Sequence, residues 1–484
     1  MMKSLNIRKK LVTLAVASAV SGGAMMMMAA PAQAMNVSQD NLGEVLLFPY
    51  YTVKNGFDTL LTVTNTSDRT AVYKIRFREA LNSREVRDFN VILSPKDHWG
   101  AVVTATTDGA LIRTFDKTCT SPRLPGMVPN ADRALPGAKG EVAFTNTLFS
   151  GNFTDGASQE MTRVQEGYFE VILMGVSTRD PSVSTNTLEY NAKHVSGVPR
   201  DCAKVDDLFL PAGVATLNGY MLAPENILKG HVTYINVTNG QAIDAEPTAL
   251  ENFNSVAGSI FEPGDLRPQL SNGDLIGNAT SLVDGATVSP GYVGSENGVS
   301  QLLRASSVIN EFATGAGAAT SWVMTFPTKH HYTDSYTAVT GPTLDDGIPS
   351  GGFSEWFYNT PPTTGDGKSC DNIGLNIYNR EEGTVQNLGN TNFSPAPTSE
   401  FVELCYETNV VDFNGSSVFG AGTNRLGVST AAVGTAGWAE LTFDENTLGG
   451  LPVIGFAATV RDAGGATVNY GSSTEHTYKR VVAP

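Results

Sequence analysis

Residues Asp58 to Trp99 read DTLLTVTNTSDRTAVYKIRFREALNSREVRDFNVILSPKDHW. In the middle of this segment apolar and basic side chains alternate: Tyr73, Ile75 and Phe77 alternate with Lys74, Arg76 and Arg78. Side chains two apart share one face of a strand, so the pattern predicts a strand with one dry face and one wet face. Segments 59–64 and 89–93 alternate in the same way and predict neighbouring antiparallel strands.

The rest of the chain has the same character. It contains 49 glycines, together with much threonine, serine and asparagine, which is typical of many short strands joined by turns. The sequence therefore predicts a mainly β protein, an antiparallel β-sandwich of immunoglobulin-like architecture with long loops. One short helix is expected at Gln301–Phe312. Its apolar residues recur at spacings of three and four: Leu302, Ala305, Ile309 and Phe312.

Three parts are expected along the chain. Residues 1–34 have the features of a secretory signal peptide: a basic start, the apolar stretch 11–20 and the small-residue cleavage site 32–34. Residues 35–339 are expected to form a β-sandwich domain with long loop insertions. Residues 340–484 are expected to form a second β-rich domain or a continuation of the first, because segment 340–368 is rich in Pro, Gly, Asp and Thr.

The chain is acidic. It has 32 basic and 48 acidic residues, which gives a net charge of −16. The predicted signal peptide holds four of the basic residues and no acidic one, so the mature chain, with 28 basic and 48 acidic residues, carries −20. Such a charge repels a phosphate backbone, which argues against a nucleic-acid partner. No segment after the signal peptide is long and apolar enough to predict a membrane span.

The four cysteines all follow the predicted signal peptide. An even number in an exported protein predicts disulfides, and four cysteines allow three connectivities. The local pairs Cys119–Cys202 and Cys370–Cys405 are favoured, because each joins loop-like sequence to a neighbouring region. No C-x-x-C pair supports the alternative of a zinc site.

No residue pattern predicts a catalytic site or an organic cofactor. Calcium is possible, since acidic loops of exported β proteins often hold it, although no segment fits the twelve-residue hand loop. The candidate ligands are weak ones in acidic loops: Asp265, Asp274, Asp284, Asp345 and Asp346.

Other polar residues leave alternatives open. Glu170 and Glu440 lie in predicted strands, and sequence does not show whether such carboxylates approach closely enough for glycoside cleavage. The adjacent His330 and His331 are interpreted as a surface cluster rather than a metal site. Several aromatic residues are candidates for stacking on sugar rings, with core packing as the default: Tyr50, Tyr51, Trp356, Phe357 and Tyr358.

One short pattern occurs twice. Residues 167–171 (GYFEV) and 437–441 (GWAEL) share glycine, an aromatic residue, one variable position, glutamate and an aliphatic residue. The pattern is typical either of two related sandwiches or of two unrelated strands that begin with the same kinds of residue. Because no fixed period occurs elsewhere, coincidence is favoured.

Two stretches carry a resemblance. Segments 58–65 through 88–95 (DTLLTVTN … DFNVILSP) and 320–329 (TSWVMTFPTK) resemble parts of exported β-rich proteins of Gram-negative bacteria that have no assigned activity. The resemblance covers a small share of the chain. It implies export and a β-rich fold, and it carries no catalytic residue or substrate.

Two functions are expected from these observations. The first is a non-enzymatic, exported protein with a structural, adhesive or surface-associated role, located in the periplasm, on the cell surface or outside the cell. The second is an extracytoplasmic protein that binds or cleaves polysaccharide. A cell-surface, matrix or polysaccharide partner is expected in either case.

Overall fold

The computed structural model describes most of the chain after residue 34, namely residues 35–124, 140–151, 154–273, 280–281, 286–287, 295–333, 369–381, 384–385, 402–443, 450–462 and 469–480. These residues fall within one compact unit, Ala34–Pro484. Nearly half of them are in strands and far fewer are in helices, so the predicted mainly β class is confirmed. The described part contains no helix with the length and apolar character needed to cross a membrane.

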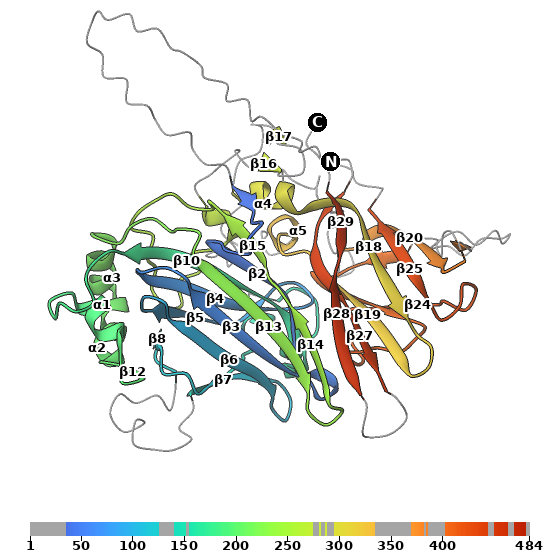
Figure 1. Ribbon diagram of the computed structural model, residues 1–484, viewed down its shortest axis with the longest axis horizontal. Helices are drawn as coiled ribbons and strands as arrows, with labels where there is room; N and C mark the ends of the chain where they lie inside the picture. The colour runs from blue at the N-terminus through green and yellow to red at the C-terminus, as the bar shows by residue number, and fades with distance from the viewer. Residues whose placement is uncertain are drawn as a thin grey trace, which may run out of the picture. The chain divides into compact units, whose positions relative to one another are not determined.

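The first half of the chain builds two large sheets (Figure 1). Sheet 1 has seven strands in the spatial order β1 (Asn36–Val37), β15 (Thr248–Glu251), β2 (Val45–Thr52), β10 (Glu166–Ser177), β4 (Thr70–Glu79), β5 (Glu85–Leu93) and β8 (Cys119–Ser121). Sheet 2 has six, in the order β14 (Gln241–Ala245), β13 (Leu228–Asn236), β3 (Asp58–Asn65), β6 (His98–Ala105), β7 (Ala110–Thr114) and β9 (Gly140–Ala143).

The second half builds two more sheets, antiparallel except for the β23–β24 pair. Sheet 3 has the order β21 (Thr384–Val385), β20 (Asp371–Asn379), β25 (Ala436–Thr442), β18 (Arg304–Ala313) and β26 (Leu451–Pro452), with β22 (Val402–Leu404) on β20 and β29 (Thr477–Arg480) on β18. Sheet 4 has the order β24 (Arg425–Val428), β23 (Thr408–Phe413), β19 (Ala318–Thr325), β27 (Ile454–Arg461) and β28 (Tyr470–Glu475). Strands β18 and β19 therefore pair with strands that follow segment 340–368.

Smaller elements connect these sheets. Two short hairpins are β11–β12 (His194–Val195 and Val198–Pro199) and β16–β17 (Thr280–Ser281 and Ala286–Thr287). The helices are all short: α1 (Thr187–Ala192), α2 (Cys202–Asp206), α3 (Pro211–Asn218), α4 (Ser295–Leu303) and α5 (His330–Thr333).

Sheets 1 and 2 pack face to face around one apolar core. Tyr73, Ile75 and Phe77 of β4 are fully buried there, together with Leu61 of β3 and Trp99 of β6. The predicted dry face of β4 is thus confirmed. Each fully buried apolar side chain of this size contributes about 1.5–3 kcal/mol to folding.

The predicted wet face of β4 is wrong. Lys74, Arg76 and Arg78 are only 1–3% exposed, because segment 253–273 lies over this face. Its backbone carbonyls accept hydrogen bonds from the basic groups, for example Pro268 O from Arg76 Nη1 at 2.8 Å. Carboxylates on the two flanking strands neutralise the three cations: Glu85, Asp88 and Glu170. An alternation of basic and apolar residues therefore does not distinguish a wet face from one whose charges are paired beneath a loop.

Sheet 4 is buried on both faces. On β19, Trp322 and Met324 enter the core shared with sheet 3, whereas Val323 between them enters the core of sheets 1 and 2. On the same side as Val323, the ring of Phe456 stacks on Tyr234 of β13 with centroids 5.4 Å apart. The apolar core is consequently continuous from the first half of the chain to the second.

The helix expected at Gln301–Phe312 is wrong for most of its length. Helix α4 ends at Leu303, and residues 304–313 form strand β18 between β25 and β29. Ala305, Val308 and Phe312 still face the core, because the register shifts between residues 305 and 307. Pairing with two neighbouring strands thus overrides a short apolar pattern with helical spacing.

The two glycines of the repeated pattern occupy equivalent positions in sheets 1 and 3. A Cβ atom on Gly167 would lie 1.9 Å from the carbonyl oxygen of Arg78 on β4. A Cβ atom on Gly437 would likewise lie 1.9 Å from the carbonyl oxygen of Tyr378 on β20. Glycine permits this approach of neighbouring backbones because it has no side chain. The glycine of the shared pattern therefore has the same physical cause in both places, which is the close approach of the neighbouring strand.

Two disulfides are present. Cys119 of β8 is bonded to Cys202 at the start of α2, and Cys370 is bonded to Cys405. These are the two local pairs that the sequence favours. The first bond attaches α2, whose neighbours α1 and α3 pack with it, to the last strand of sheet 1.

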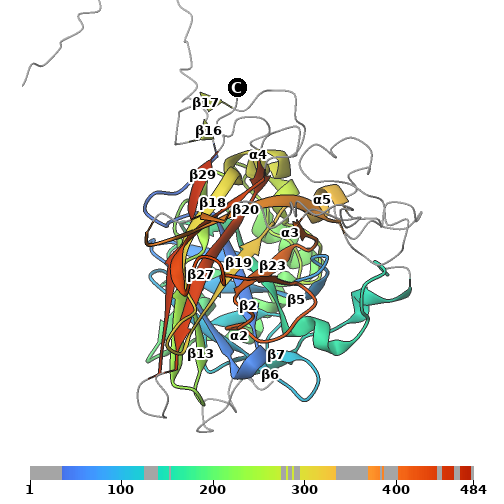
Figure 2. The same ribbon diagram turned by 90° about the vertical axis from the view of Figure 1, so that its right-hand side faces the viewer.

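The outer strands of sheets 2 and 4 run beside each other: Figure 1 shows β14 next to β28, and Figure 2 shows β13 and β27 on the same side of the molecule. The hydroxyl of Ser473 on β28 donates to the carbonyl oxygen of Asp244 on β14. A Cβ atom on Gly471 would lie only 2.6 Å from the carbonyl oxygen of Ala242. The two edges therefore cover each other, although they are not paired as strands of one sheet.

Candidate functional site

A groove of about 510 Å³ lies where sheets 2 and 4 meet. This volume is within the range typical of small-molecule sites. Apolar side chains from several elements form part of the wall, among them Val37, Leu302 and Phe456. The titratable groups of the lining come from β13, β14, β28 and β29 and the residue after β14: His231, Asp244, Glu246, Glu475, Tyr478 and Arg480.

The register of β13 and β14 positions His231 between two carboxylates. Asp244 and Glu246 are two residues apart, so their side chains point to the same face of the sheet. His231 Nδ1 lies 3.1 Å from Glu246 Oε1, and its Nε2 lies 3.4 Å from Asp244 Oδ1. Thr233 Oγ1 also donates to Asp244 Oδ1 at 2.6 Å. In contrast, Oε2 of Glu246 is shielded from solvent and has no hydrogen-bond partner among the described residues.

The opposite wall carries Tyr478 and Arg480 of β29. The Tyr478 hydroxyl donates to the carbonyl oxygen of Gly455 at 3.0 Å, and the guanidinium carbon of Arg480 lies 4.0 Å from the Tyr478 ring centroid. Arg480 Nη1 donates to the backbone carbonyls of Leu303 and Val453. Burial lowers the pKa of Arg480 to about 10, which leaves it charged at neutral pH. Both side chains are therefore held in place by the protein itself.

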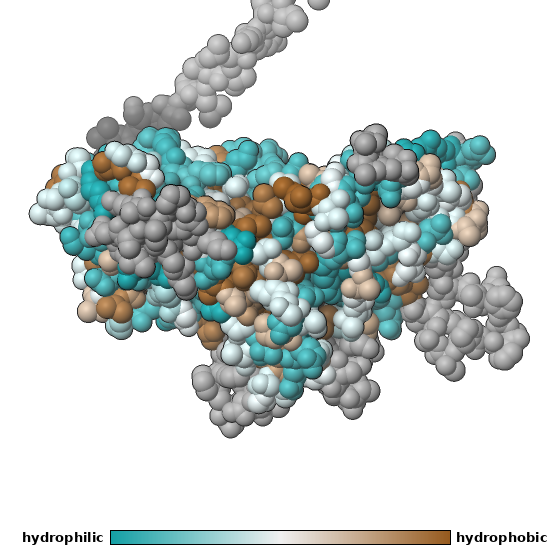
Figure 3. All heavy atoms as spheres, turned by 90° about the horizontal axis from the view of Figure 1, so that it is seen from below, coloured by the Kyte–Doolittle hydropathy of each residue, from teal (hydrophilic) through white to brown (hydrophobic). Residues whose placement is uncertain are grey.

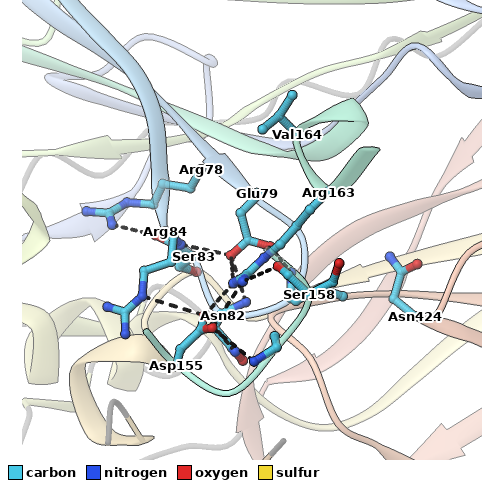
Figure 4. Close-up of polar contacts among 12 residues, drawn as sticks. Arg78, Glu79, Asn82, Ser83, Arg84, Asp155, Ser158, Arg163, Val164 and Asn424 are labelled. Carbon is cyan, nitrogen blue, oxygen red and sulfur yellow. Dashed lines mark hydrogen bonds and ion pairs between the residues drawn. The ribbon is translucent and has the colours of Figure 1, made fainter. Parts of the chain in front are cut away.

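A second polar cluster lies inside the first sandwich (Figure 4). Glu79 ends β4, and Arg163 comes from the short 3-10 helix Met161–Gln165. Arg163 donates to both oxygens of Glu79 at 2.8 Å and to both oxygens of Asp155. Burial alone would raise the pKa of Asp155, but the hydrogen bond and charge of Arg163 outweigh it and lower the pKa. The cluster is a closed set of ion pairs, not an acid–base pair poised for proton transfer.

Glu166, the first residue of β10, is the centre of a third cluster. Its carboxylate accepts from Tyr50 at 2.7 Å, from Lys54 at 2.5 Å and from Arg425 of β24 at 2.9 Å. Burial would raise the pKa of Glu166, but the charges of Arg425 and Lys54 lower it. Because β24 belongs to sheet 4, this carboxylate links sheets 1 and 4.

Of the predicted calcium ligands, the described residues include Asp265 alone. Both carboxylate oxygens of Asp265 accept from Arg267, at 3.1 and 2.9 Å. The other candidates lie outside the described residues: Asp274, Asp284, Asp345 and Asp346. Calcium binding stays a prediction.

Cys370, Glu403 and Cys405 form the one group of three potential metal ligands found within the described residues. Both cysteines are in a disulfide, so neither offers the thiolate that a metal requires.

Other residues singled out from the sequence have structural partners. Glu170 is paired with Arg78 at 2.5 Å in the interior, and Glu440 is paired with Lys479 at 2.5 Å. His330 and His331 are the first two residues of α5 and are both buried, with ring centroids 4.0 Å apart, so the interpretation as a surface cluster is wrong. Burial lowers the pKa of His330 well below its ordinary value.

The aromatic candidates for sugar stacking divide in two. Tyr50 and Tyr51 are fully buried in the core between sheets 1 and 2. This agrees with the core packing expected for them from the sequence. The other three lie outside the described residues: Trp356, Phe357 and Tyr358.

An exposed aromatic pair that the sequence does not single out lies on the outer side of sheet 3. The rings of Tyr378 on β20 and Trp438 on β25 stack with centroids 4.1 Å apart and an interplanar angle of 12°. The two residues face each other in the strand register, and Trp438 is 38% exposed. Elsewhere, the face shown in Figure 3 mixes hydrophilic residues with small groups of apolar ones, as is usual for protein surfaces.

The groove was not predicted from the sequence. His231, Asp244 and Glu246 lie within 16 positions of each other, and a hairpin turn at Asn239-Gly240 brings the first beside the other two. This hairpin is predictable from its turn dipeptide. Glu475 and Arg480 belong to a distant part of the chain, and no local pattern relates them to His231.

The comparisons with known proteins place no constraint on the function. No family model matches the chain, no curated protein matches it, and no solved structure matches it.

Proposed function

We propose that this chain is an exported protein of a Gram-negative bacterium with a structural, adhesive or surface-associated role and no catalytic activity. Residues 1–34 act as its signal peptide, and the mature protein resides in the periplasm, on the cell surface or outside the cell. Its two halves each form a sandwich of immunoglobulin-like type. The two disulfides support export, because disulfides persist in oxidising compartments.

The main support for a non-catalytic role is the engagement of the buried carboxylates described above. Glu79, Glu166 and Glu170 each accept charged hydrogen bonds from arginine or lysine. A general acid or base needs a pKa near the working pH and access to substrate. Carboxylates held in ion pairs instead specify how elements pack, which suits a protein whose role is mechanical or adhesive.

Fractionation of the native host tests this proposal. The full chain should appear in the periplasm, outer surface or medium by mass spectrometry, whereas a chain without residues 1–34 should stay in the cytoplasm. Deletion of the gene should change cell attachment or surface architecture. Unchanged attachment together with the loss of a hydrolytic activity would refute the non-catalytic role.

A second candidate is a polysaccharide-binding protein, and the stacked Tyr378–Trp438 pair favours it. Trp438 is 38% exposed and stacks on Tyr378, and exposed aromatic rings provide an apolar face with a polar edge on which a sugar ring can pack. A glycan array probed with the mature protein should then give hits that Trp438→Ala abolishes. Tyr470→Ala is a matched control, because Tyr470 is a similarly exposed aromatic residue on β28. An array without hits excludes this candidate.

A further inference from the structure

We infer that the groove between sheets 2 and 4 binds a small organic cation that carries an ammonium group, such as an amino sugar or a polyamine. The inference goes beyond the proposed surface role and does not use the Tyr378–Trp438 pair. It rests on the size of the groove, the balance of charge in its lining and the way its polar groups are held.

The size indicates an organic ligand. About 510 Å³ is far more than a single ion needs and is comparable to sites for small molecules. The carboxylates are also not preassembled for a metal, because the groups of potential metal ligands among the described residues do not include Asp244, Glu246 or Glu475. A molecule with several carbon atoms matches this space better than a bare divalent cation.

The charge of the lining indicates a cation. Three carboxylates, from Asp244, Glu246 and Glu475, face one arginine and one histidine. The arginine is Arg480, whose Nη1 donates to the backbone carbonyls of Leu303 and Val453. The negative charge of the whole chain adds a field that attracts cations from a distance.

His231 bridges two carboxylates of the groove wall. His231 contacts one oxygen of each neighbouring carboxylate, which orients both of them beside the groove. The second oxygen of Glu246 has no hydrogen-bond partner among the described residues and is shielded from solvent. The Glu246 and Asp244 side chains as a whole stay 34% and 65% exposed, so an ammonium group can approach their accessible oxygens, and charge-assisted hydrogen bonds of this kind are among the strongest in proteins.

The apolar part of the wall explains why the ligand is organic as well as charged. Phe456 and Leu302 line the groove beside the ring of Tyr478, whose hydroxyl is engaged with Gly455. Carbon atoms next to the ammonium group would pack on these side chains. Neutral sugars would gain the packing but would leave the carboxylate of Glu246 without its cation.

Isothermal titration calorimetry on the mature, disulfide-bonded protein tests the inference, with glucosamine, spermidine, N-acetylglucosamine and calcium chloride as separate probes. Glucosamine or spermidine should bind, and N-acetylglucosamine, which lacks the positive charge, should bind at least about 10-fold more weakly, a difference of about 1.4 kcal/mol. The better of the two amines identifies the ligand as an amino sugar or a polyamine.

Variants locate the site. Glu246→Gln and Asp244→Asn should each weaken binding of the amine at least about 10-fold. Asp108→Asn is the matched control, because it removes an exposed carboxylate outside the groove, and it should leave binding unchanged. Unchanged melting temperatures would show that the variants are folded. The inference is refuted if neither amine binds, if N-acetylglucosamine binds as well as glucosamine, if calcium alone binds, or if Glu246→Gln and Asp244→Asn bind normally.

Discussion

Arg163 and Glu79 form a two-point ion pair inside the first sandwich, with Nε and Nη2 of the arginine each 2.8 Å from one oxygen of the carboxylate. Both side chains are at most 1% exposed. The same arginine binds Asp155, which also lies 3.6 Å from Nε of the buried Arg84, so two cations serve the two buried anions. Removal of one member therefore leaves charge in a place where water cannot compensate for it.

Arg163→Met should lower the free energy of unfolding by about 3–5 kcal/mol, because Glu79 loses its arginine and Asp155 keeps only the longer contact with Arg84. The measurement is equilibrium unfolding in guanidinium chloride followed by tryptophan fluorescence. Arg113→Met is the control, since Arg113 and Glu141 form a pair in which each side chain is about one-third exposed. Its cost should be about 1 kcal/mol or less. Equal costs for the two variants would contradict the structural role of the buried pair.

Gly437→Ala should destabilise the protein by about 1–3 kcal/mol or more, as overpacking does. The added methyl group would meet the backbone oxygen of Tyr378, which cannot rotate away as a side chain does. Gly427→Ala on β24 is the control, because a Cβ atom there has no neighbour within 4 Å. Thermal unfolding by circular dichroism distinguishes them. A stable Gly437→Ala protein would show that β20 and β25 lie farther apart than described.

Because His476 is buried, we expect the free energy of unfolding of the protein to fall in mild acid. Burial lowers the pKa of His476 to about 4 in the folded protein, whereas the ordinary value is 6.5. Between these values the unfolded chain binds more protons than the folded one, so stability falls as the pH falls from about 6.5 to about 4. A difference of this size corresponds to about 3 kcal/mol. Urea unfolding at a series of pH values measures it.

His476→Gln should reduce this pH dependence, because it removes one of the buried groups that must gain a proton; the buried His330, whose pKa is also lowered, contributes the remainder. The ion-paired carboxylates Glu166 and Asp155 act at lower pH: their pKa values are lowered, so their contribution is lost only as the pH falls below 4.5 and 3.8. A midpoint unaffected by His476→Gln would assign the mild-acid transition to another group.

Removal of the Cys119–Cys202 disulfide should reduce stability substantially. The bond closes a loop with a sequence separation of 83, for which chain entropy alone gives about 4–5 kcal/mol. The double variant Cys119→Ser/Cys202→Ser should therefore unfold at lower denaturant concentration. Reduction with dithiothreitol should lower the wild-type midpoint and leave the variant with only the effect of the second bond. A variant as stable as wild type would show that β8 and α2 hold together without the bond.

Part of this fold can be predicted from local patterns in the sequence. The alternation around Tyr73 correctly predicts a strand with one dry face, and loop-like surroundings correctly pair the four cysteines. Both inferences depend on neighbours in the sequence. The second face of β4 depends instead on a segment about 190 residues away, which covers Lys74 and Arg76.

The same limit applies to β18 and to the groove. The apolar spacing of Ala305 and Phe312 fits a helix and also fits a strand with a register shift, and only the partners β25 and β29 decide between them. Likewise, Glu475 reaches the groove through the contact of two sheets built from different halves of the chain. Properties that arise from such distant contacts are not visible in a single sequence.

The mutual cover of β14 and β28 limits how this protein can assemble. An open outer strand is a template to which another molecule can add its own strand, and that route leads to uncontrolled polymerisation. Here each strand occupies the place that such a molecule would take, through Ser473 and Gly471. Any ordered array built from this protein must therefore grow through side-chain surfaces or through other outer strands, not through β14 or β28.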